Sequence, residues 1–242
     1  LGVGQVFAAL SGLILTVGLV RLLDQAHYGQ YNYILALSGV VGVFSLSGMD
    51  PAVAQAVARG HKRTLLHGFS TKLWWGLPAG IVTILAGGYY LLQDNSTLGL
   101  SLIVIGVCSP LLYATSLYGS YYNGTREFKK LAIDNAVRNC IITVSILIVA
   151  YITQNVVYVI SAYFLSNTLT SGIRFIVLAR TIRTESETQH TESLSLGKHL
   201  SAMNLVSNIS LYLDKILIFQ MLGATPLALY ALALAPVKQL QN

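Results

Sequence analysis

The stretch LGLSLIVIGVCSPLLYATSLYG, at positions 98–119, contains no charged residue. A transmembrane α-helix needs about 20 mainly apolar residues, because each residue adds about 1.5 Å and the hydrocarbon core is about 30 Å thick. The stretch is therefore long enough to cross a bilayer as one helix. Segment 73–92 is equally free of charge, and a short polar turn at 94–97 separates the two. Together they predict two consecutive transmembrane helices.

The composition of the whole chain agrees with this prediction. Of its 242 residues, 54% are hydrophobic and 10% are charged, and the mean hydropathy is +0.64. A water-soluble domain of this size has about a quarter of its residues charged, so the composition argues against a soluble domain. We interpret the formal net charge of +6 as a signal of membrane topology and expect no nucleic-acid partner.

Similar apolar segments continue in both directions from 73–119. We expect seven spans and the start of an eighth, at about 2–20, 30–48, 73–92, 98–119, 136–153, 156–178, 200–221 and from 227 onward. The predicted fold class is an all-α membrane protein, a polytopic helical bundle. The chain begins without Met inside one apolar run and stops inside another. We therefore expect a truncated fragment of a longer protein.

Lysine and arginine alternate between the predicted connections. The first connection contains one basic residue, Arg21, and the later odd-numbered connections contain no lysine or arginine. Each even-numbered connection contains several basic residues, and Lys72 is counted with the second connection. The positive-inside rule then places the even-numbered connections and the N-terminus in the cytoplasm. We expect the mildly amphipathic segment 51–69 to lie on the cytoplasmic face against anionic headgroups. The hydrophilic segment 181–198 is expected to be a cytoplasmic linker.

An internal repeat supports a two-part organisation. Segment 21–37 aligns without gaps on segment 220–236, and each joins an odd span to an even one. The identities are Leu23 with Leu222, Tyr31 with Tyr230, Leu35 with Leu234 and Ala36 with Ala235. Six spans per repeat in the same orientation imply two six-helix halves related by an axis along the membrane normal. We expect an N-terminal lobe at 1–180, the linker at 181–198 and the start of a second lobe at 199–242.

The seventh span contains the strongest polar candidates. Ionisable residues within a span are costly and mark functional sites by default; here they are Asp214 and Lys215. On a helical wheel, one arc of roughly 80° holds five polar residues: Ser201, Asn204, Asn208, Tyr212 and Lys215. This polar face predicts either the wall of a hydrated cavity or an interhelical ion pair that holds the bundle together.

Three arginines stand at the ends of predicted spans: Arg21, Arg138 and Arg174. Such side chains either extend to the headgroups or turn inward. In the inward orientation a guanidinium offers bidentate binding to a diphosphate.

No pattern of catalytic residues is present in the sequence. It lacks a glycine-rich phosphate-binding loop, and its histidines and cysteines lack metal-ligand spacing. We therefore expect no enzymatic activity, no cofactor and no metal, unless a missing half holds an active site.

Several motifs resemble one family of membrane proteins. They are RLL…YGQY at 21–31, GMDPA…ARG at 48–60, YNG…F at 122–128 and DKIL…LGA…LY at 214–230. In these motifs the chain resembles the O-antigen and teichoic-acid flippases of polysaccharide biosynthesis. That family lies within the superfamily of multidrug-and-toxin extruders (MATE), so the resemblance implies a MATE-like two-lobe transporter.

The resemblance also implies a function. Such proteins are thought to move an undecaprenyl-diphosphate-linked oligosaccharide from the cytoplasmic to the outer leaflet of the bacterial inner membrane by alternating access. The implied partners are this lipid-linked oligosaccharide, membrane lipids, the polysaccharide polymerase and other assembly proteins. The candidate substrate-binding residues are Asn204, Asn208, Tyr212, Asp214, Lys215, Arg138 and Arg21.

Three alternatives stay open. A cation-coupled drug antiporter of the same superfamily usually needs acidic residues within the first lobe, where this sequence has few. A flippase for a lipid-linked peptidoglycan precursor would use similar chemistry on a different headgroup. The third alternative is a non-transporting scaffold or fragment, because a chain this short would lack half of the cavity wall.

Overall fold

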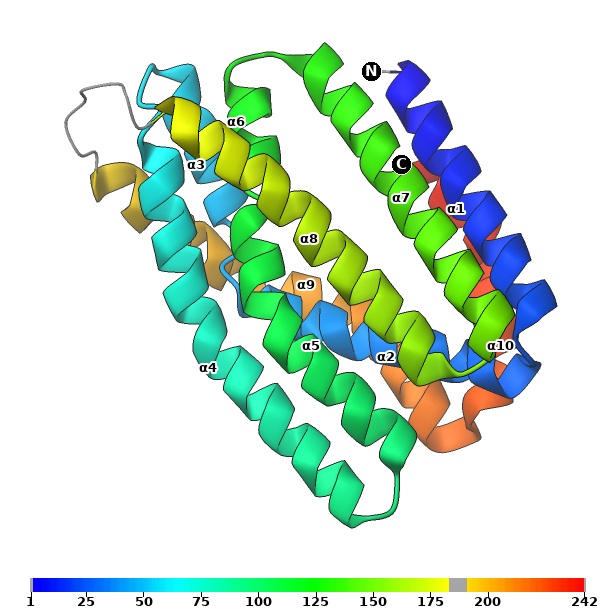
Figure 1. The fold of residues 1–242 in the computed structure, drawn as a ribbon. Helices are drawn as coiled ribbons and strands as arrows, with labels where there is room; N and C mark the ends of the chain where they lie inside the picture. Colours follow the sequence, from blue (N-terminus) through cyan, green and yellow to red (C-terminus); the bar gives the residue numbers. More distant parts are fainter. Residues whose placement is uncertain (1, 183–190, 242) are drawn as a thin grey trace.

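The computed structural model of the chain describes residues 2–182 and 191–241. Within them, the chain is helical apart from turns and short connections (Figure 1). This confirms the predicted all-α bundle. The helices are α1 (Gly2–Leu22), α2 (Gln25–Val43), α3 (Met49–Ala58), α4 (Thr64–Leu92), α5 (Ser96–Thr115), α6 (Tyr118–Gly124), α7 (Phe128–Thr153), α8 (Val156–Ile182), α9 (Thr191–Leu222) and α10 (Ala224–Gln241).

Five described segments are long and apolar enough to cross a membrane. They comprise α4, α7, α8, the segment Ser96–Gly124 that joins α5 to α6, and Leu194–Leu222 of α9. Shorter apolar segments in α1 and α10 cover Ala8–Leu22 and Ala224–Ala235. Every predicted span falls on one of these helices or on α2, so the polytopic membrane bundle is the correct fold class.

Helix α2 is not among these apolar segments and lies inside the bundle. It contacts α9 and α10 on one side and α4, α5 and α8 on others, and Tyr28, Tyr31 and Tyr33 are buried along it. The ring of Tyr33 stacks on Phe219 of α9, with centroids 3.8 Å apart and planes 7° apart. Because neighbouring helices bury much of α2, the helix need not be apolar on every face.

The connections between helices gather at two ends of the bundle (Figure 1). The α1–α2, α4–α5, α7–α8 and α9–α10 turns lie at one end, which we call the turn end. Helices α3 and α6, the end of α8 and the start of α9 lie at the other end, which we call the α3/α6 end. The chain therefore alternates in direction as the sequence predicts.

Glycines set the close packing of α4 on α5. A Cβ atom added at Gly80 would lie 2.7 Å from the carbonyl oxygen of Gly106, and one at Gly87 would lie 2.8 Å from that of Gly99. Such contacts leave no space for a side chain, so the backbones meet directly. Small residues at helix crossings are the usual means of packing transmembrane helices.

The segment 51–69 packs its apolar side chains against protein. It forms most of α3 and the start of α4, and Gly60 adopts a φ of 101° between the two helices. Val53, Val57 and Leu65 are buried in a cluster with side chains at the start of α6 and on α8. The apolar face of this segment is therefore covered by protein rather than by the membrane surface.

Several helices extend beyond the predicted spans. Helix α4 begins at Thr64 rather than near 73, and α9 begins at Thr191, so residues 191–198 of the expected linker are helical. The centre of that linker, 183–190, lies outside the described residues. Hydropathy locates the part of a helix that is apolar, and these helices continue past it.

The two repeated segments meet in the structure. The α1–α2 turn and the α9–α10 turn lie at the same end (Figure 1), and α2 packs on α10. A Cβ added at Gly29 of α2 would lie 1.9 Å from the carbonyl oxygen of Ala224, at the start of α10. The two helical hairpins are therefore in direct backbone contact.

Candidate functional site: a polar cavity between α2, α4, α5 and α9

A cavity of about 220 Å³ lies between α2, α4, α5 and α9, beside the start of α3. We call it the polar cavity. Its wall combines glycine backbone with two charged residues, an amide, two tyrosines and several serines. It lies toward the α3/α6 end, because its lining includes the turn that joins α2 to α3.

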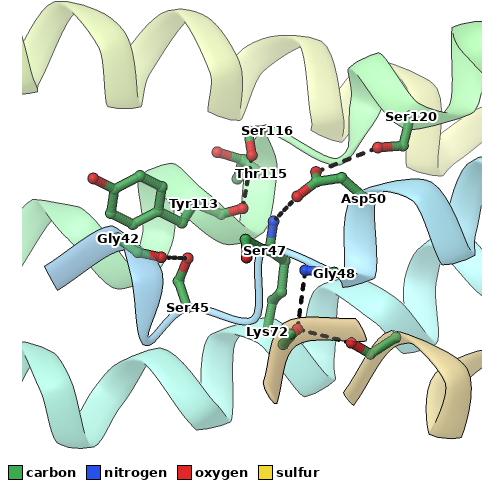
Figure 2. Close-up of polar contacts among 12 residues, drawn as sticks. Gly42, Ser45, Ser47, Gly48, Asp50, Lys72, Tyr113, Thr115, Ser116 and Ser120 are labelled. Carbon is green, nitrogen blue, oxygen red and sulfur yellow. Dashed lines mark hydrogen bonds and ion pairs between the residues drawn. The ribbon is translucent and has the colours of Figure 1, made fainter. Parts of the chain in front are cut away.

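An ion pair forms one side of the polar cavity. The Nζ atom of Lys72 lies 2.7 Å from Oδ2 of Asp50, and the side chains are 3% and 40% exposed respectively. Ser120 of α6 donates a hydrogen bond of 3.3 Å to the other carboxylate oxygen (Figure 2). Lys72 is thus neutralised inside the bundle, whereas part of Asp50 faces the cavity. This corrects the assignment of Lys72 to a cytoplasmic connection.

The turn at 44–48 brings Asp50 into this position. Leu46 adopts a φ of 60° in the turn between α2 and α3. The backbone N–H of Gly48 donates to Oγ of Ser201 on α9 at 2.9 Å, and Ser201 itself donates to the carbonyl of Gly197 at 2.7 Å. A Cβ at Gly48 would lie 2.4 Å from the backbone nitrogen of Ser201. Glycine is therefore required for the turn to lie directly on α9.

Helix α9 contributes two polar side chains to the same cavity. Asn208 donates a 3.0 Å hydrogen bond from Nδ2 to Oγ of Ser47. Tyr212 lies against Gly39 of α2, where an added Cβ would come within 2.3 Å of its ring. From α5, Tyr113 donates a 3.0 Å hydrogen bond to the carbonyl of Ser38. The cavity therefore joins the first helices of the chain to its seventh predicted span.

The polar cavity is suited to a ligand with many hydroxyl groups. Its hydroxyl groups both donate and accept, the Asn208 amide carries an acceptor oxygen, and Asp50 offers acceptor lone pairs. The ion pair adds no net charge, so hydrogen bonding rather than charge dominates this site. The described residues hold no group of three histidine, cysteine or acidic side chains placed to bind a metal.

A second polar pocket, of about 270 Å³, lies between α1, α7 and α8 around Arg138. We call it the Arg138 pocket. The Nε atom of Arg138 is buried without a hydrogen-bond partner, and no ion pair of Arg138 occurs among the described residues. Asn139, Asn167 and Tyr163 complete much of the polar wall. Arg138 thus turns inward and carries a charge that no described acidic group neutralises.

Tyr163 lies between the polar cavity and the Arg138 pocket. It is close enough to Arg138 and to Tyr212 to interact electrostatically with both. Because Tyr163 lines the Arg138 pocket and Tyr212 lines the polar cavity, the two sites are neighbours within one bundle.

The other predicted site residues lie elsewhere. Asn204 is exposed, and Arg21 is exposed at the turn end. The Asp214 carboxylate accepts hydrogen bonds from the Tyr230 hydroxyl and the Lys215 backbone N–H, and the Lys215 side chain is half-buried. None of these four site candidates lines the polar cavity or the Arg138 pocket.

Arg174 also turns inward, in a different setting. It contacts both the backbone carbonyl and the carboxylate of Asp134 on α7 and lies 5.9 Å from the ring centre of Tyr118 on α6. These contacts neutralise its charge and join three helices, so Arg174 has a structural role here.

Asp50 and Lys72 were not identified as site residues from the sequence, because each lies at the edge of a predicted span. One signal in the sequence does locate Lys72. It follows Gly68 and precedes Gly76 and Gly80 at intervals of four residues, and all four residues are buried on one face of α4. Residues four apart share a helix face, so this glycine stripe indicates that Lys72 faces inward.

Comparison with known proteins identifies the family. The family model described as "Polysaccharide biosynthesis protein" matches residues 1–242. The chain belongs to this family. A Shigella flexneri protein described as "Putative O-antigen transporter" is 23% identical over 239 residues, which cover 88% of this chain and 54% of the relative.

The chain thus spans about half the length of the curated relative that it matches. No solved structure matches it. The family membership agrees with the predicted resemblance, which rested on motifs spread from α1 to α10.

Proposed function

We propose that the protein is a membrane transporter that moves an undecaprenyl-diphosphate-linked oligosaccharide from the cytoplasmic to the outer leaflet by alternating access. On this proposal it resides in the bacterial inner membrane with a cytoplasmic N-terminus and catalyses no covalent chemistry. Residues 1–180 form its N-terminal lobe, 181–198 the linker and 199–242 the start of a second lobe. The polysaccharide polymerase and other assembly proteins are proposed partners.

The observation that carries the proposal is the polar cavity inside an apolar bundle. A sugar headgroup loses its hydrogen bonds to water when it enters a membrane, and each unsatisfied polar group costs several kcal/mol there. Asn208, Tyr212, Ser47 and Asp50 provide replacement hydrogen bonds. Family membership places this cavity in a protein of polysaccharide biosynthesis.

The Arg138 pocket supports a phosphate-bearing substrate. A guanidinium within a bundle is costly unless an anion pairs with it, and the described residues provide none for Arg138. A diphosphate would supply that anion with bidentate geometry. We assign Arg138 to the diphosphate and the polar cavity to the sugar.

Export complementation tests the proposal. The full-length parent protein is expressed in a bacterium that lacks its own surface-polysaccharide flippase but makes the matching repeat unit. Restored surface polysaccharide, lost again in Arg138→Gln, supports the assignment. If the protein is correctly inserted in the strain that makes the matching repeat unit, and surface polysaccharide is still not restored, the proposal is refuted.

One observation favours a cation-coupled antiporter as the second candidate. Asp50 places a carboxylate in the first lobe, partly open to the polar cavity. Lys72 already neutralises this carboxylate at 2.7 Å, however, which weakens it as a cation site. Drug resistance conferred by the protein and abolished in Asp50→Asn at an equal level of inserted protein would favour the antiporter.

A further inference from the structure

A largely apolar groove of about 480 Å³ lies between α4, α5 and α8. We call it the α4/α5/α8 groove. Leu66 and Phe69 of α4, Leu111 of α5, and Phe175 and Ile176 of α8 form its apolar wall, and Arg180 stands at one end. Its volume falls within the range of about 300–1,000 Å³ that is typical of small-molecule sites.

The interior of this groove offers no free polar group to a ligand. Its one uncharged polar side chain is Thr115, whose hydroxyl already donates to the carbonyl oxygens of Leu111 at 2.8 Å and Leu112 at 3.1 Å. A hydrocarbon chain could therefore occupy the groove without leaving a buried donor unsatisfied.

The groove faces away from the start of the proposed second lobe. Figure 1 shows α4, α5 and α8 in front, whereas α9 and α10 lie behind them. Ile176 of the groove wall is exposed, and so are Ile173 and Val177 beside it. In a membrane these side chains would meet lipid, and Ile176 belongs both to this surface and to the wall of the groove.

A positive charge marks the end of the groove. Arg180 is exposed, and no described residue forms an ion pair with it. It lies in the last turn of α8, at the α3/α6 end. Arg63 adjoins the start of α4 at that end. Basic residues beside a crevice between transmembrane helices attract anionic lipid headgroups.

We propose that the α4/α5/α8 groove binds an anionic phospholipid, with one acyl chain along the groove and the headgroup phosphate at Arg180. The apolar wall selects the chain and Arg180 selects the negative headgroup. This site is separate from the polar cavity and the Arg138 pocket, and lipid binding there does not depend on the proposed transport function.

Gly172 provides a direct way to close the groove. It lines the groove, and a Cβ added there meets no atom within 4 Å. Gly172→Leu should therefore fill the groove without displacing a neighbour. Gly88 of α4 also has open space at its Cβ and does not line the groove, so Gly88→Leu is the matched control.

The test uses the full-length protein in phosphatidylethanolamine vesicles that contain a photoactivatable phosphatidylglycerol with the reactive group on its acyl chain. Crosslinks should map to α4 and α8 along the groove. Gly172→Leu should abolish them, Gly88→Leu should leave them unchanged, and Arg180→Gln should reduce them about fivefold, as expected for one cation near a membrane surface.

Two results would overturn the assignment. Equal crosslinking by the corresponding phosphatidylethanolamine probe would show that the groove does not select an anionic headgroup. Displacement of the probe by a polyprenyl diphosphate but not by unlabelled phosphatidylglycerol would assign the groove to a different lipid.

Discussion

At the scale of single residues, Lys72 shows how a cation is accommodated within an apolar helix. Its side chain is 3% exposed, and its Nζ atom contacts Asp50, whose side chain is 40% exposed. The two charges therefore differ in their access to water. Removal of either side chain leaves the other without its ion-pair partner. Lys72 would then be a buried charge without a counter-ion, whereas Asp50 would be partly exposed to water.

This asymmetry predicts unequal effects of two substitutions. Asp50→Asn should lower the free energy of unfolding by about 3 kcal/mol, because a buried ammonium loses its counter-ion. Lys72→Met should cost only about 1 kcal/mol, since Asp50 can still reach water. Thermal unfolding in detergent measures both, and the double variant gives their coupling. A larger loss for Lys72→Met than for Asp50→Asn would contradict this ion-pair geometry.

The polar arc of α9 was predicted from sequence, but only part of it enters the cavity. Asn208 and Tyr212 line the wall, whereas Asn204, one turn earlier on the same arc, is exposed. A helical wheel gives the direction of a side chain around the axis and not which neighbouring helix stands opposite each turn. The Asp50–Lys72 pair depends on the fold of the 44–48 turn, which no periodic pattern reveals.

A matched pair on α9 tests which part of the arc is functional. Asn208→Leu should reduce polysaccharide export at least tenfold, because it removes an amide from the polar cavity and its hydrogen bond to Ser47. Asn204→Leu makes the same chemical change at an exposed site and should leave export within about twofold of the parent. The complementation assay compares them at equal membrane levels. An equal loss of export in both variants would indicate that the whole polar arc of α9, rather than the part that lines the cavity, is needed for export.

At the scale of helices, the spans were predictable and their crossings were not. Uncharged apolar stretches locate α4 and α5 because lipid requires apolar surfaces of fixed length. Which helices touch depends on small residues at particular positions, such as Gly29 of α2 against Ala224 of α10. The repeat aligned these two hairpins in sequence but gave no sign that they pack on each other.

The crossing of α2 and α10 leads to a prediction about Gly29. Gly29→Ala should destabilise the protein by about 1–3 kcal/mol, because its Cβ would lie 1.9 Å from a backbone oxygen that belongs to another helix. Gly88→Ala adds the same methyl where space is open, and it should be neutral or slightly stabilising. Unfolding temperature in detergent is the readout. Indistinguishable variants would show that α2 and α10 are not in backbone contact.

At the scale of the whole molecule, the two ends of the bundle differ in charge. Arg59, Lys62, Arg63 and Arg126 lie in connections at the α3/α6 end, whereas Arg21 is close to the turn end. In the orientation that we propose from the positive-inside rule, the α3/α6 end is cytoplasmic. The polar cavity lies toward that end, where a substrate made in the cytoplasm would enter.

Cysteine accessibility tests this orientation. In a background with Cys108→Ala and Cys140→Ser, a membrane-impermeant maleimide should label Gln93→Cys in intact spheroplasts. Lys129→Cys should be labelled only after lysis, because Lys129 starts α7 at the α3/α6 end and Gln93 caps α4 at the turn end. The reversed pattern of labelling would place the polar cavity near the outer leaflet and exclude cytoplasmic loading.

The most direct measurement of the central claim is transbilayer movement in a purified system. The full-length protein is reconstituted into vesicles that contain an undecaprenyl-diphosphate-linked oligosaccharide carrying the repeat unit of its own host. An impermeant glycosidase then digests only the outward-facing fraction. We predict that the protein renders nearly all of the lipid accessible, whereas vesicles with Arg138→Gln, or without protein, expose only about half. Accessibility that stays at half with correctly inserted protein would contradict the account.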